Sequence, residues 1–245
     1  MNLILLEPDE VDAAGDATLS DERARHALAV LHAAPGHSMR IGLVDGPTGT
    51  GTVTAVTPRA LTMHCAFDVA TPPRPRVDLL LALPRPKVVR RLWPQLSALG
   101  VGRIILTNAE RVERHYFDTH ILEPEHYRPW LIDGLQQARD TRLPIVSIHR
   151  QFKVLIEDQL DTMVDDGVRV VADPSASATL DSVVGSNDAS RLLLAVGPEG
   201  GWNASELDLL AAKGFRTIGM GPRTLRSDTA CVALITLAHR ALARA

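Results

Sequence analysis

Hydrophobic and polar residues alternate with a period of two along much of the first seventy residues, which is typical of strands with one buried face. The longest such run is residues 61–69, and a shorter run at residues 39–43 ends in the turn sequence Asp45-Gly46-Pro47. Residues 20–31 instead have apolar positions at helical spacing, and Ser20 is placed to cap that helix. The pattern predicts a small β-barrel with one early helix.

Three prolines within residues 72–75 break this pattern and indicate a stiff linker, because proline continues neither a helix nor a central strand. Beyond the linker, continuous apolar strands alternate with helices, as in a parallel sheet that is covered on both faces. The expected strands are residues 77–83, 103–107, 167–172, 191–196 and 217–220, and the expected helices are residues 88–99, 127–138, 203–212 and 229–244. We therefore expect an α/β fold with two domains, residues 1–71 and 72–245.

Composition excludes several classes of protein. Of the 245 residues, 45% are hydrophobic and 22% are charged, with a net charge of −3, which is unlike a disordered charged chain. No apolar run approaches the roughly 20 residues of a membrane helix, and the amino terminus lacks the pattern of a secretory signal. Cys65 and Cys231 belong to no CxxC pair, which argues against a disulfide framework or a cysteine zinc site. These features predict a cytoplasmic protein.

Positive charge is concentrated in one segment. Residues 74–114 contain nine Lys or Arg residues and three acids, so this segment carries +6 in a chain of net charge −3. A local positive field of this kind is expected for a partner with a phosphate backbone. The alternative is an arginine-rich helix face that is merely solvated.

The first candidate ligand loop follows the expected strand 191–196. It reads Gly197-Pro198-Glu199-Gly200-Gly201, and the helix that follows has Asn203 and Glu206 at the spacing of a capping box. Glycines at the carboxyl end of a sheet strand let the backbone approach a ligand. The loop matches neither GxGxxG nor GxxxxGK[ST], which disfavours the usual dinucleotide and triphosphate sites. A tight turn without a ligand remains the alternative.

A second loop of similar character spans residues 219–230. A short strand again ends in glycine and proline, followed by Arg223, Arg226 and a helix that Ser227 or Asp228 could cap. Loops that follow strands of one parallel sheet would face one pocket. The two arginines would then either reach the pocket or pair with Glu199 or Asp228.

Together these two loops resemble the signature pair of a known family. GPEGG with an early helical Glu, followed by LGxRILRxETA, is characteristic of the SPOUT-class ribosomal small subunit RNA methyltransferase E family, which are 16S rRNA uridine-N3 methyltransferases. Here GPEGG and Glu206 are intact, and the second motif reads MGPRTLRSDTA at residues 220–230. The resemblance extends over most of the chain, with departures at His32, Gln95, Ala98, Gln136, Asp140, Thr224 and Asp228.

The resemblance implies a small N-terminal PUA-like β-barrel and a C-terminal SPOUT α/β domain with a deep trefoil knot. It also implies S-adenosylmethionine as cofactor, ribosomal RNA as partner, and a homodimer. The expected cofactor-binding residues are Ala172, Gly197, Gly200, Gly201, Met220, Gly221 and Leu225. The expected catalytic residues are Arg226, Arg223 and Glu199, and the expected RNA-binding residues are Arg23, Arg25, His26, Arg40, Arg85, Arg90 and Arg91.

Methyl transfer to uracil N3 needs removal of its proton and stabilisation of the charge that develops on the flanking carbonyl oxygens. We expect Arg226 to stabilise that charge, with Arg223 as a second candidate, and Glu199 or Asp228 to act as base. Because base pairing hides N3, the uridine must be unpaired or flipped out. We expect no metal site. Two alternatives stay open: a methyltransferase for another RNA, and a non-enzymatic RNA-binding or ribosome-assembly protein with the same fold.

Overall fold

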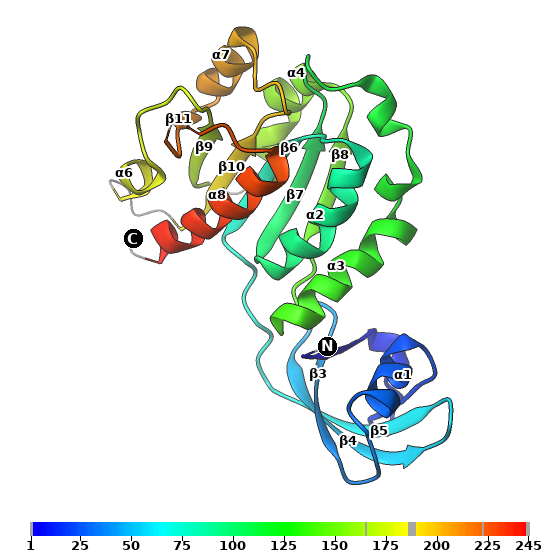
Figure 1. Ribbon diagram of the computed structural model, residues 1–245. Helices are drawn as coiled ribbons and strands as arrows, with labels where there is room; N and C mark the ends of the chain where they lie inside the picture. Colours follow the sequence, from blue (N-terminus) through cyan, green and yellow to red (C-terminus); the bar gives the residue numbers. More distant parts are fainter. Residues whose placement is uncertain (1, 165, 186–189, 222, 244–245) are drawn as a thin grey trace. The chain divides into compact units, whose positions relative to one another are not determined.

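A computed structural model describes residues 2–164, 166–185, 190–221 and 223–243 (Figure 1). The chain forms two compact units. The first unit comprises residues 1–74 together with residues 131–143, and the second comprises residues 75–130 and 144–245. The domain boundary expected after residue 71 lies three residues before the first of these divisions. The return of residues 131–143 to the first unit has no local signal in the sequence.

A five-stranded mixed sheet with the order β1-β3-β4-β5-β2 forms the first unit. Its strands are β1 (Ile4–Leu6), β2 (Asp16–Leu19), β3 (Ser38–Leu43), β4 (Thr48–Val56) and β5 (Leu61–Phe67). The β1–β3 pair is parallel, and the other three pairs are antiparallel. Inward-facing side chains such as Ile41, Leu61 and Met63 are fully buried in one apolar core.

Helix α1 (Glu22–Ala29) covers this core with Ala24 and Ala27. The prediction that Ser20 caps this helix is wrong. Asp21 is the N-cap, and its carboxylate accepts a hydrogen bond from the backbone N–H of Arg23. Asp is as good a cap as Ser, and it was one position further along than the expected boundary. A short 3₁₀ helix, η1 (Pro8–Glu10), connects β1 to the turn before β2.

A six-stranded sheet with the order β11-β9-β10-β6-β7-β8 forms the second unit, and every neighbouring pair is parallel. The strands are β6 (Val77–Ala82), β7 (Val101–Thr107), β8 (Ile145–His149), β9 (Val168–Ala172), β10 (Leu192–Val196) and β11 (Arg216–Ile218). All residues of β6 and β10 are buried, as expected for central strands covered on both faces. The expectation of an α/β fold with a parallel sheet is confirmed.

Figure 1 shows α2 (Pro86–Ala98) and α8 (Ser227–Leu242) crossing in front of this sheet. The remaining helical segments are α3 (Pro124–Ala138), α4 (Phe152–Val154), α5 (Leu160–Met163), α6 (Leu180–Val184) and α7 (Ala204–Ala212), with 3₁₀ turns at Arg114–Phe117 (η2) and His120–Leu122 (η3) and a π-helical turn at Leu155–Gln159 (η4). Within the described ranges, no helix has both the length and the apolar character that crossing a bilayer requires.

The caps of two helices test the sequence interpretation directly. At α7, the capping box of Asn203 and Glu206 is confirmed: each side chain accepts a backbone N–H of the other residue. At α8, the prediction of a cap by Ser227 or Asp228 is wrong, because both lie inside the helix and the N-cap is Arg226, which makes no side-chain cap. The expected end of this helix, at residue 244, lies outside the described residues.

Candidate active site

The carboxyl ends of three neighbouring parallel strands form the edge on which the site is built. The strands β11, β9 and β10 lie side by side, and the chain leaves them at Ile218, Ala172 and Val196. Loops that leave one edge of a parallel sheet are the usual place for ligands in α/β proteins. The glycine-rich loop at residues 197–202 and the loop at residues 219–226 are therefore neighbours, as the sequence predicts.

A cavity of about 310 Å³ lies among these loops and the beginning of α8. The residues predicted to bind a cofactor all line it: Ala172, Gly197, Gly200, Gly201, Met220, Gly221 and Leu225. Other lining residues, which were not predicted to bind a cofactor, are Thr224 in the second loop and Ser227, Ala230 and Leu234 in α8. The structure thus brings both motifs into one wall of one cavity.

Two details show that this cavity is built closely around its backbone. A Cβ atom on Gly219 would lie 2.2 Å from the carbonyl oxygen of Ala176, so only glycine fits there. Trp202 is 8% exposed and stacks on Phe152, with ring centroids 5.3 Å apart. Its buried Nε1–H has no hydrogen-bond partner among the described residues. An unpaired buried donor in a cavity wall is a group that a bound ligand can satisfy.

The two carboxylates that the sequence placed nearest the site, Glu199 and Asp228, pair with Arg85 and Arg91 of the α2 segment rather than with the arginines of the second loop. Glu199 lines the cavity, and its Oε2 lies 3.2 Å from Nε of Arg85. Asp228, in the first turn of α8, has its Oδ2 2.6 Å from Nη2 of Arg91. Arg85 is the N-cap residue of α2, and Arg91 lies within that helix.

Arg223 and Arg226 are exposed, and within the described part of the chain neither side chain forms an ion pair or hydrogen bond. The expectation that they could pair with Glu199 or Asp228 is therefore not met. Arg223 lines the cavity, whereas Arg226, immediately before α8, does not. Pro222, which lies between them and Gly221, is outside the described residues.

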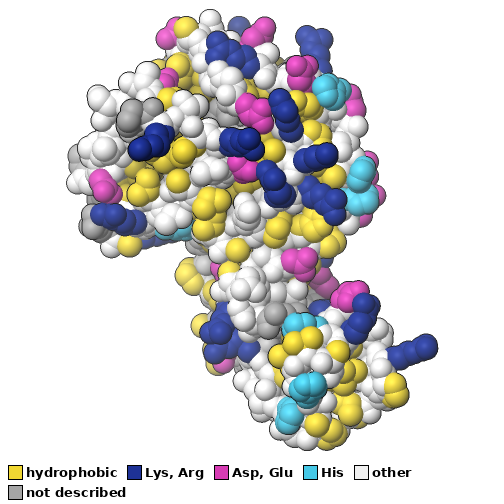
Figure 2. All heavy atoms as spheres, in the orientation of Figure 1, with side chains coloured by type: hydrophobic (Ala, Val, Ile, Leu, Met, Phe, Trp, Pro, Cys, Tyr) yellow, Lys and Arg dark blue, Asp and Glu magenta, His cyan; other side chains and the backbone are white. Residues whose placement is uncertain are grey.

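The basic residues of α2 form part of a cationic surface beside the cavity. Figure 2 shows Lys and Arg side chains gathered on the face of the second unit over which α2 runs. Arg90 lies over the ring of Trp130, with its Cζ 5.5 Å from the ring centroid. Arg85 and Arg91 remain 65% and 60% exposed despite their ion pairs. All three can therefore offer charge to a phosphate backbone.

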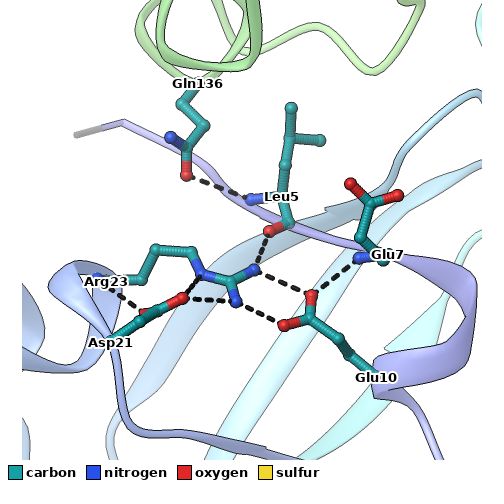
Figure 3. Close-up of polar contacts among 6 residues, drawn as sticks. All are labelled: Leu5, Glu7, Glu10, Asp21, Arg23 and Gln136. Carbon is teal, nitrogen blue, oxygen red and sulfur yellow. Dashed lines mark hydrogen bonds and ion pairs between the residues drawn. The ribbon is translucent and has the colours of Figure 1, made fainter. Parts of the chain in front are cut away.

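Arg23, predicted to contact RNA, is instead occupied within the first unit (Figure 3). Its Nη1 donates to the carbonyl oxygen of Leu5 at 2.7 Å and to Oε2 of Glu10 at 2.9 Å. Its Nη2 contacts the other Glu10 oxygen and lies 2.7 Å from Oδ2 of Asp21. Gln136, from α3, accepts a hydrogen bond from the N–H of Leu5 in the same view. The Arg23 side chain is only 19% exposed, so its contacts are internal.

The other basic residues proposed for the first unit are more available. Arg25 is 68% exposed and pairs only with Glu22, at 2.7 Å, and His26 is half-buried. Arg40 is exposed on β3 and lines a second cavity, of about 520 Å³, together with His37 and other residues. Figure 2 shows histidine and hydrophobic side chains together on this unit.

Two functional contacts were missed by sequence reasoning. Glu206, which is buried, accepts the backbone N–H of Glu110 at 2.7 Å as well as that of Asn203 at 2.8 Å. Arg111 donates from Nη1 to the carbonyl oxygens of Gly200 and Gly201, the latter at 3.5 Å. In the sequence Arg111 is visible only as one charge in the basic segment, because its partners are almost ninety positions away.

The histidines between residues 115 and 126 do not converge on a buried site. The rings of His120 and His126 lie 4.8 Å apart. Among the described residues, Glu123, Glu125 and His126 place ligand atoms within 4.8 Å of one another, and all three side chains are exposed. Exposed groups of this kind are common without an ion, and the absence of a metal site stays a prediction.

Comparison with known proteins gives the same picture across the whole chain. The family model described as an RNA methyltransferase domain matches residues 71–239. The ribosomal RNA small subunit methyltransferase E of Treponema pallidum is 32% identical over 249 residues, covering 98% of this chain and 92% of that protein. The ribosomal RNA small subunit methyltransferase E 1 of Borreliella burgdorferi is 24% identical and covers 95% of both chains.

Solved structures of similar fold include two that hold S-adenosylmethionine. One is the ribosomal RNA small subunit methyltransferase E of Neisseria gonorrhoeae, with a TM-score of 0.77, 19% identity, and coverage of 98% of this chain and 97% of that one. The other is a Legionella pneumophila protein with a TM-score of 0.75, 18% identity, and the same coverage. At this level of identity the likeness concerns the fold.

Proposed function

The chain belongs to the RNA methyltransferase family, and we propose that it methylates N3 of a uridine in small-subunit (16S) ribosomal RNA. Family membership makes it an S-adenosylmethionine-dependent ribosomal RNA methyltransferase. The small-subunit target is proposed from the printed names of its relatives, and the N3 position of the uridine is what the resemblance of its two loop motifs implies. The observation that carries the proposal is the cavity of about 310 Å³ in which both glycine-bearing motifs meet.

The residues of the cavity fit the donor. Its walls are mainly backbone, glycine and apolar side chains, and the unpaired Nε1–H of Trp202 offers one more donor. When bound, S-adenosylmethionine supplies a methyl group on a positively charged sulfur that a ring nitrogen can attack. The role of the protein is then to align the methyl donor with the uracil ring. This alignment by itself lowers much of the activation barrier for methyl transfer.

We propose that Arg226 acts on the incoming base rather than on the donor. It lies just outside the residues that line the cavity, and its guanidinium is free of partners within the described residues. As the proton leaves N3, negative charge spreads onto the flanking carbonyl oxygens, and an unpaired guanidinium stabilises that charge. Arg223, which lines the cavity, is a second candidate for this role or a phosphate contact.

Glu199 is the proposed base, with Asp228 as the alternative. Both carboxylates are paired with arginines of α2, at 3.2 Å and 2.6 Å. Glu199 lines the cavity and is 44% exposed, so it can meet a proton that leaves towards solvent. The ion pair with Arg85 or Arg91 also fixes the position from which each carboxylate could accept the proton.

Ribosomal RNA would be held by both units. We propose that the first unit is a PUA-like barrel that contacts RNA through Arg25, His26 and Arg40. In the second unit Arg85, Arg90 and Arg91 would contact phosphates beside the cavity. A trefoil knot in the second unit, a homodimer and a cytoplasmic location complete the proposal. We leave Arg23 out of the interface because its guanidinium is engaged internally.

Two of the departures from the family motifs in the middle of the chain, Gln136 and Asp140, make contacts within the first unit rather than in the site. The side-chain oxygen of Gln136 accepts the N–H of Leu5 at 3.4 Å. Asp140 accepts the N–H groups of Thr141 and Arg142, at 2.6 Å and 3.0 Å. Gln136, Asp140 and the residues they contact all belong to the first unit, so these two side chains have structural roles there. This favours the enzyme over a non-enzymatic binding protein.

The proposal is tested by incubating the protein and labelled S-adenosylmethionine with small subunits that lack the modification. A methyl group on N3 blocks base pairing, so a reverse transcriptase stops one nucleotide before it, which maps the position. We expect one stop in 16S rRNA, and none with Arg226→Ala at equal S-adenosylmethionine affinity. Label in another RNA would point to a different target. Binding of S-adenosylmethionine with no label in any RNA would favour the assembly-protein alternative.

A further inference from the structure

Two consecutive residues, Glu110 and Arg111, contact the glycine-rich loop and the helix that follows it, and neither lines the cavity. They follow β7, whereas the loop follows β10, so they are almost ninety positions apart in sequence. Neither residue lines the cavity of about 310 Å³, whereas Gly200, Gly201 and Trp202 do. The contacts therefore lie on the side of the loop that faces away from the proposed donor.

In the first turn of α7, the backbone of Glu110 contacts a buried carboxylate. Glu206 is 7% exposed, and its two oxygens accept the N–H of Glu110 at 2.7 Å and the N–H of Asn203 at 2.8 Å. A charge-assisted hydrogen bond to a buried group is strong and costly to break. The segment that carries Arg111 is thereby fastened to the first turn of α7.

The Arg111 side chain contacts the glycine-rich loop itself, at Gly200 and Gly201. Its Nη1 donates to the carbonyl oxygens of Gly200 and Gly201, the second at 3.5 Å. A Cβ atom on residue 200 would lie 2.9 Å from Cδ of Arg111, so the aliphatic part of the side chain occupies the space that another residue would fill. The glycine at position 200 leaves room for this arginine.

These carbonyl contacts decide how the loop presents its N–H groups. In a trans peptide the C=O and the following N–H point in opposite directions, so a carbonyl held by Arg111 turns the next N–H away from it. The N–H of Gly201 donates to the carbonyl of Pro198 at 2.8 Å and closes a turn. The N–H of Trp202 has no acceptor among the described residues, and Trp202 lines the cavity. Gly201 has a φ of +73°, where glycine is favoured and a peptide flip is easy.

We propose that Arg111 is a positioning residue, which fixes the Gly200–Gly201 and Gly201–Trp202 peptides so that the Trp202 N–H points away from Arg111 and can donate to the bound S-adenosylmethionine. This inference rests on the proposed function, since it assigns the cavity to that donor. Without the guanidinium, two adjacent glycines leave these peptides free to flip, and a carbonyl would meet the ligand instead of a donor. Arg111 thus acts on binding without touching the ligand.

The test compares Arg111→Ala, Arg111→Lys and a matched control in the full-length protein. The control is Arg114→Ala, which removes an exposed arginine three positions along, in η2. Titration calorimetry with S-adenosylmethionine should give a Kd about tenfold higher for Arg111→Ala, the size expected for loss of one charged hydrogen-bonded contact. Arg111→Lys should recover part of the affinity, because an ammonium reaches one carbonyl but not two. Arg114→Ala should bind as the wild type does.

A second measurement needs no ligand. Amide hydrogen exchange of residues 197–203 in the free protein should be faster in Arg111→Ala and unchanged in Arg114→Ala. Gly200→Ala should weaken binding in the wild type but add little in Arg111→Ala, since both changes remove the same contact. Unchanged exchange in Arg111→Ala, or faster exchange with unchanged affinity, would overturn the proposal. A wild-type protein that bound no S-adenosylmethionine would instead overturn the proposed function, while the exchange data would still show whether Arg111 holds the loop.

Discussion

Arg23 connects three segments of the first unit through one side chain. The guanidinium contacts Glu10 at the end of η1, Asp21 at the beginning of α1, and the backbone of β1 at Leu5 (Figure 3). With 19% of its side chain exposed, this arginine has few alternative partners in water. Removal of one member of such a network leaves the other charges poorly solvated, which costs more than the contacts themselves contribute.

We therefore expect Arg23→Ala to lower the free energy of unfolding of the protein by about 2–3 kcal/mol. Urea unfolding followed by circular dichroism measures this change. The matched control is Arg25→Ala in the same helix, whose ion pair with Glu22 is exposed and should contribute less than about 0.5 kcal/mol. Equal losses for the two variants would mean that Arg23 does not act through its network.

The same network makes stability depend on pH in the acid range. A hydrogen bond from Arg23 lowers the pKa of the Glu10 carboxyl, against the opposing effect of burial. Burial also acts to raise the pKa of Asp21, but the hydrogen bond and the charge of Arg23 outweigh it, and the net shift is downward. Carboxyls with a lowered pKa in the folded state stabilise it above their unfolded values and lose this contribution as pH falls.

We expect the free energy of unfolding to fall as pH drops below about 4, the ordinary range of these carboxyls, and down through their lowered folded-state values. Urea unfolding at a series of pH values between 6 and 3 gives the slope of the free energy of unfolding against pH. These limits lie roughly two units above and one unit below the ordinary pKa range of the carboxyls. In Arg23→Gln, which keeps a polar side chain but no charge, the slope should be shallower. An unchanged slope would show that other carboxyls determine the acid sensitivity.

At the scale of elements, the beginning of α7 is held by more than its own cap. Thr179 and Ser182 at the beginning of α6 form a capping box of the same local kind as Asn203 and Glu206. Only Glu206 has an additional partner from another element, the N–H of Glu110. The two capping boxes have the same local pattern, but we expect the one at α7 to contribute more to the free energy of unfolding than the one at α6.

We expect Glu206→Ala to lower the free energy of unfolding by about 2–3 kcal/mol, because it leaves two N–H groups without their acceptor. Thr179→Ala should cost about 1 kcal/mol, the usual effect of one exposed cap. Chemical denaturation of the two variants gives the comparison. A cost for Glu206→Ala no larger than that for Thr179→Ala would show that the bond to Glu110 contributes nothing.

At the scale of the whole molecule, positive charge is concentrated in one segment, which we expect to contact RNA. The segment of residues 74–114 carries +6, and Arg85, Arg90 and Arg91 present part of it beside the cavity. Contacts between arginines and phosphates release bound counterions. The logarithm of the binding constant for RNA should therefore fall steeply and linearly with the logarithm of the salt concentration.

Arg90→Ala should lower the magnitude of that slope by about 1, as expected for loss of one phosphate contact. The control is Arg240→Ala, an exposed arginine in the last turns of α8. Fluorescence anisotropy with a labelled rRNA fragment over a series of salt concentrations measures both slopes. If the two variants reduce the salt-dependence slope equally, the affinity depends on the total charge of the protein and not on the position of each arginine. In that case α2 would not be a specific part of the RNA interface.

How far local pattern predicts structure differs between the elements. Apolar runs located β6 and β10, and glycine with proline located both cavity loops. The pattern did not predict β1, β2 or β8, which are three of the four edge strands of the two sheets. β2 and β8 are short and partly exposed, and β1 is buried but only three residues long, so each has a weak periodic signal and is identified only by its pairing with another strand.

Several properties of this protein follow from the order of its residues alone. Continuous apolar strands alternating with helices determine a parallel α/β sheet, and an Asn with a Glu three positions later determines where α7 begins. Both depend on interactions within a few residues, which a sequence displays directly. The two glycine-bearing loops were located from the same kind of local pattern, whereas the individual residues expected to bind a cofactor came from the family resemblance.

The tertiary structure alone decided which charged side chain meets which. It assigned Arg23 to an internal network, Arg85 and Arg91 to the carboxylates beside the cavity, and Arg111 to the carbonyls of the glycine loop. It also brought residues 131–143 back to the first unit. An ion pair or a carbonyl contact forms between atoms that only folding brings together, so residue type and local period carry no record of the partner.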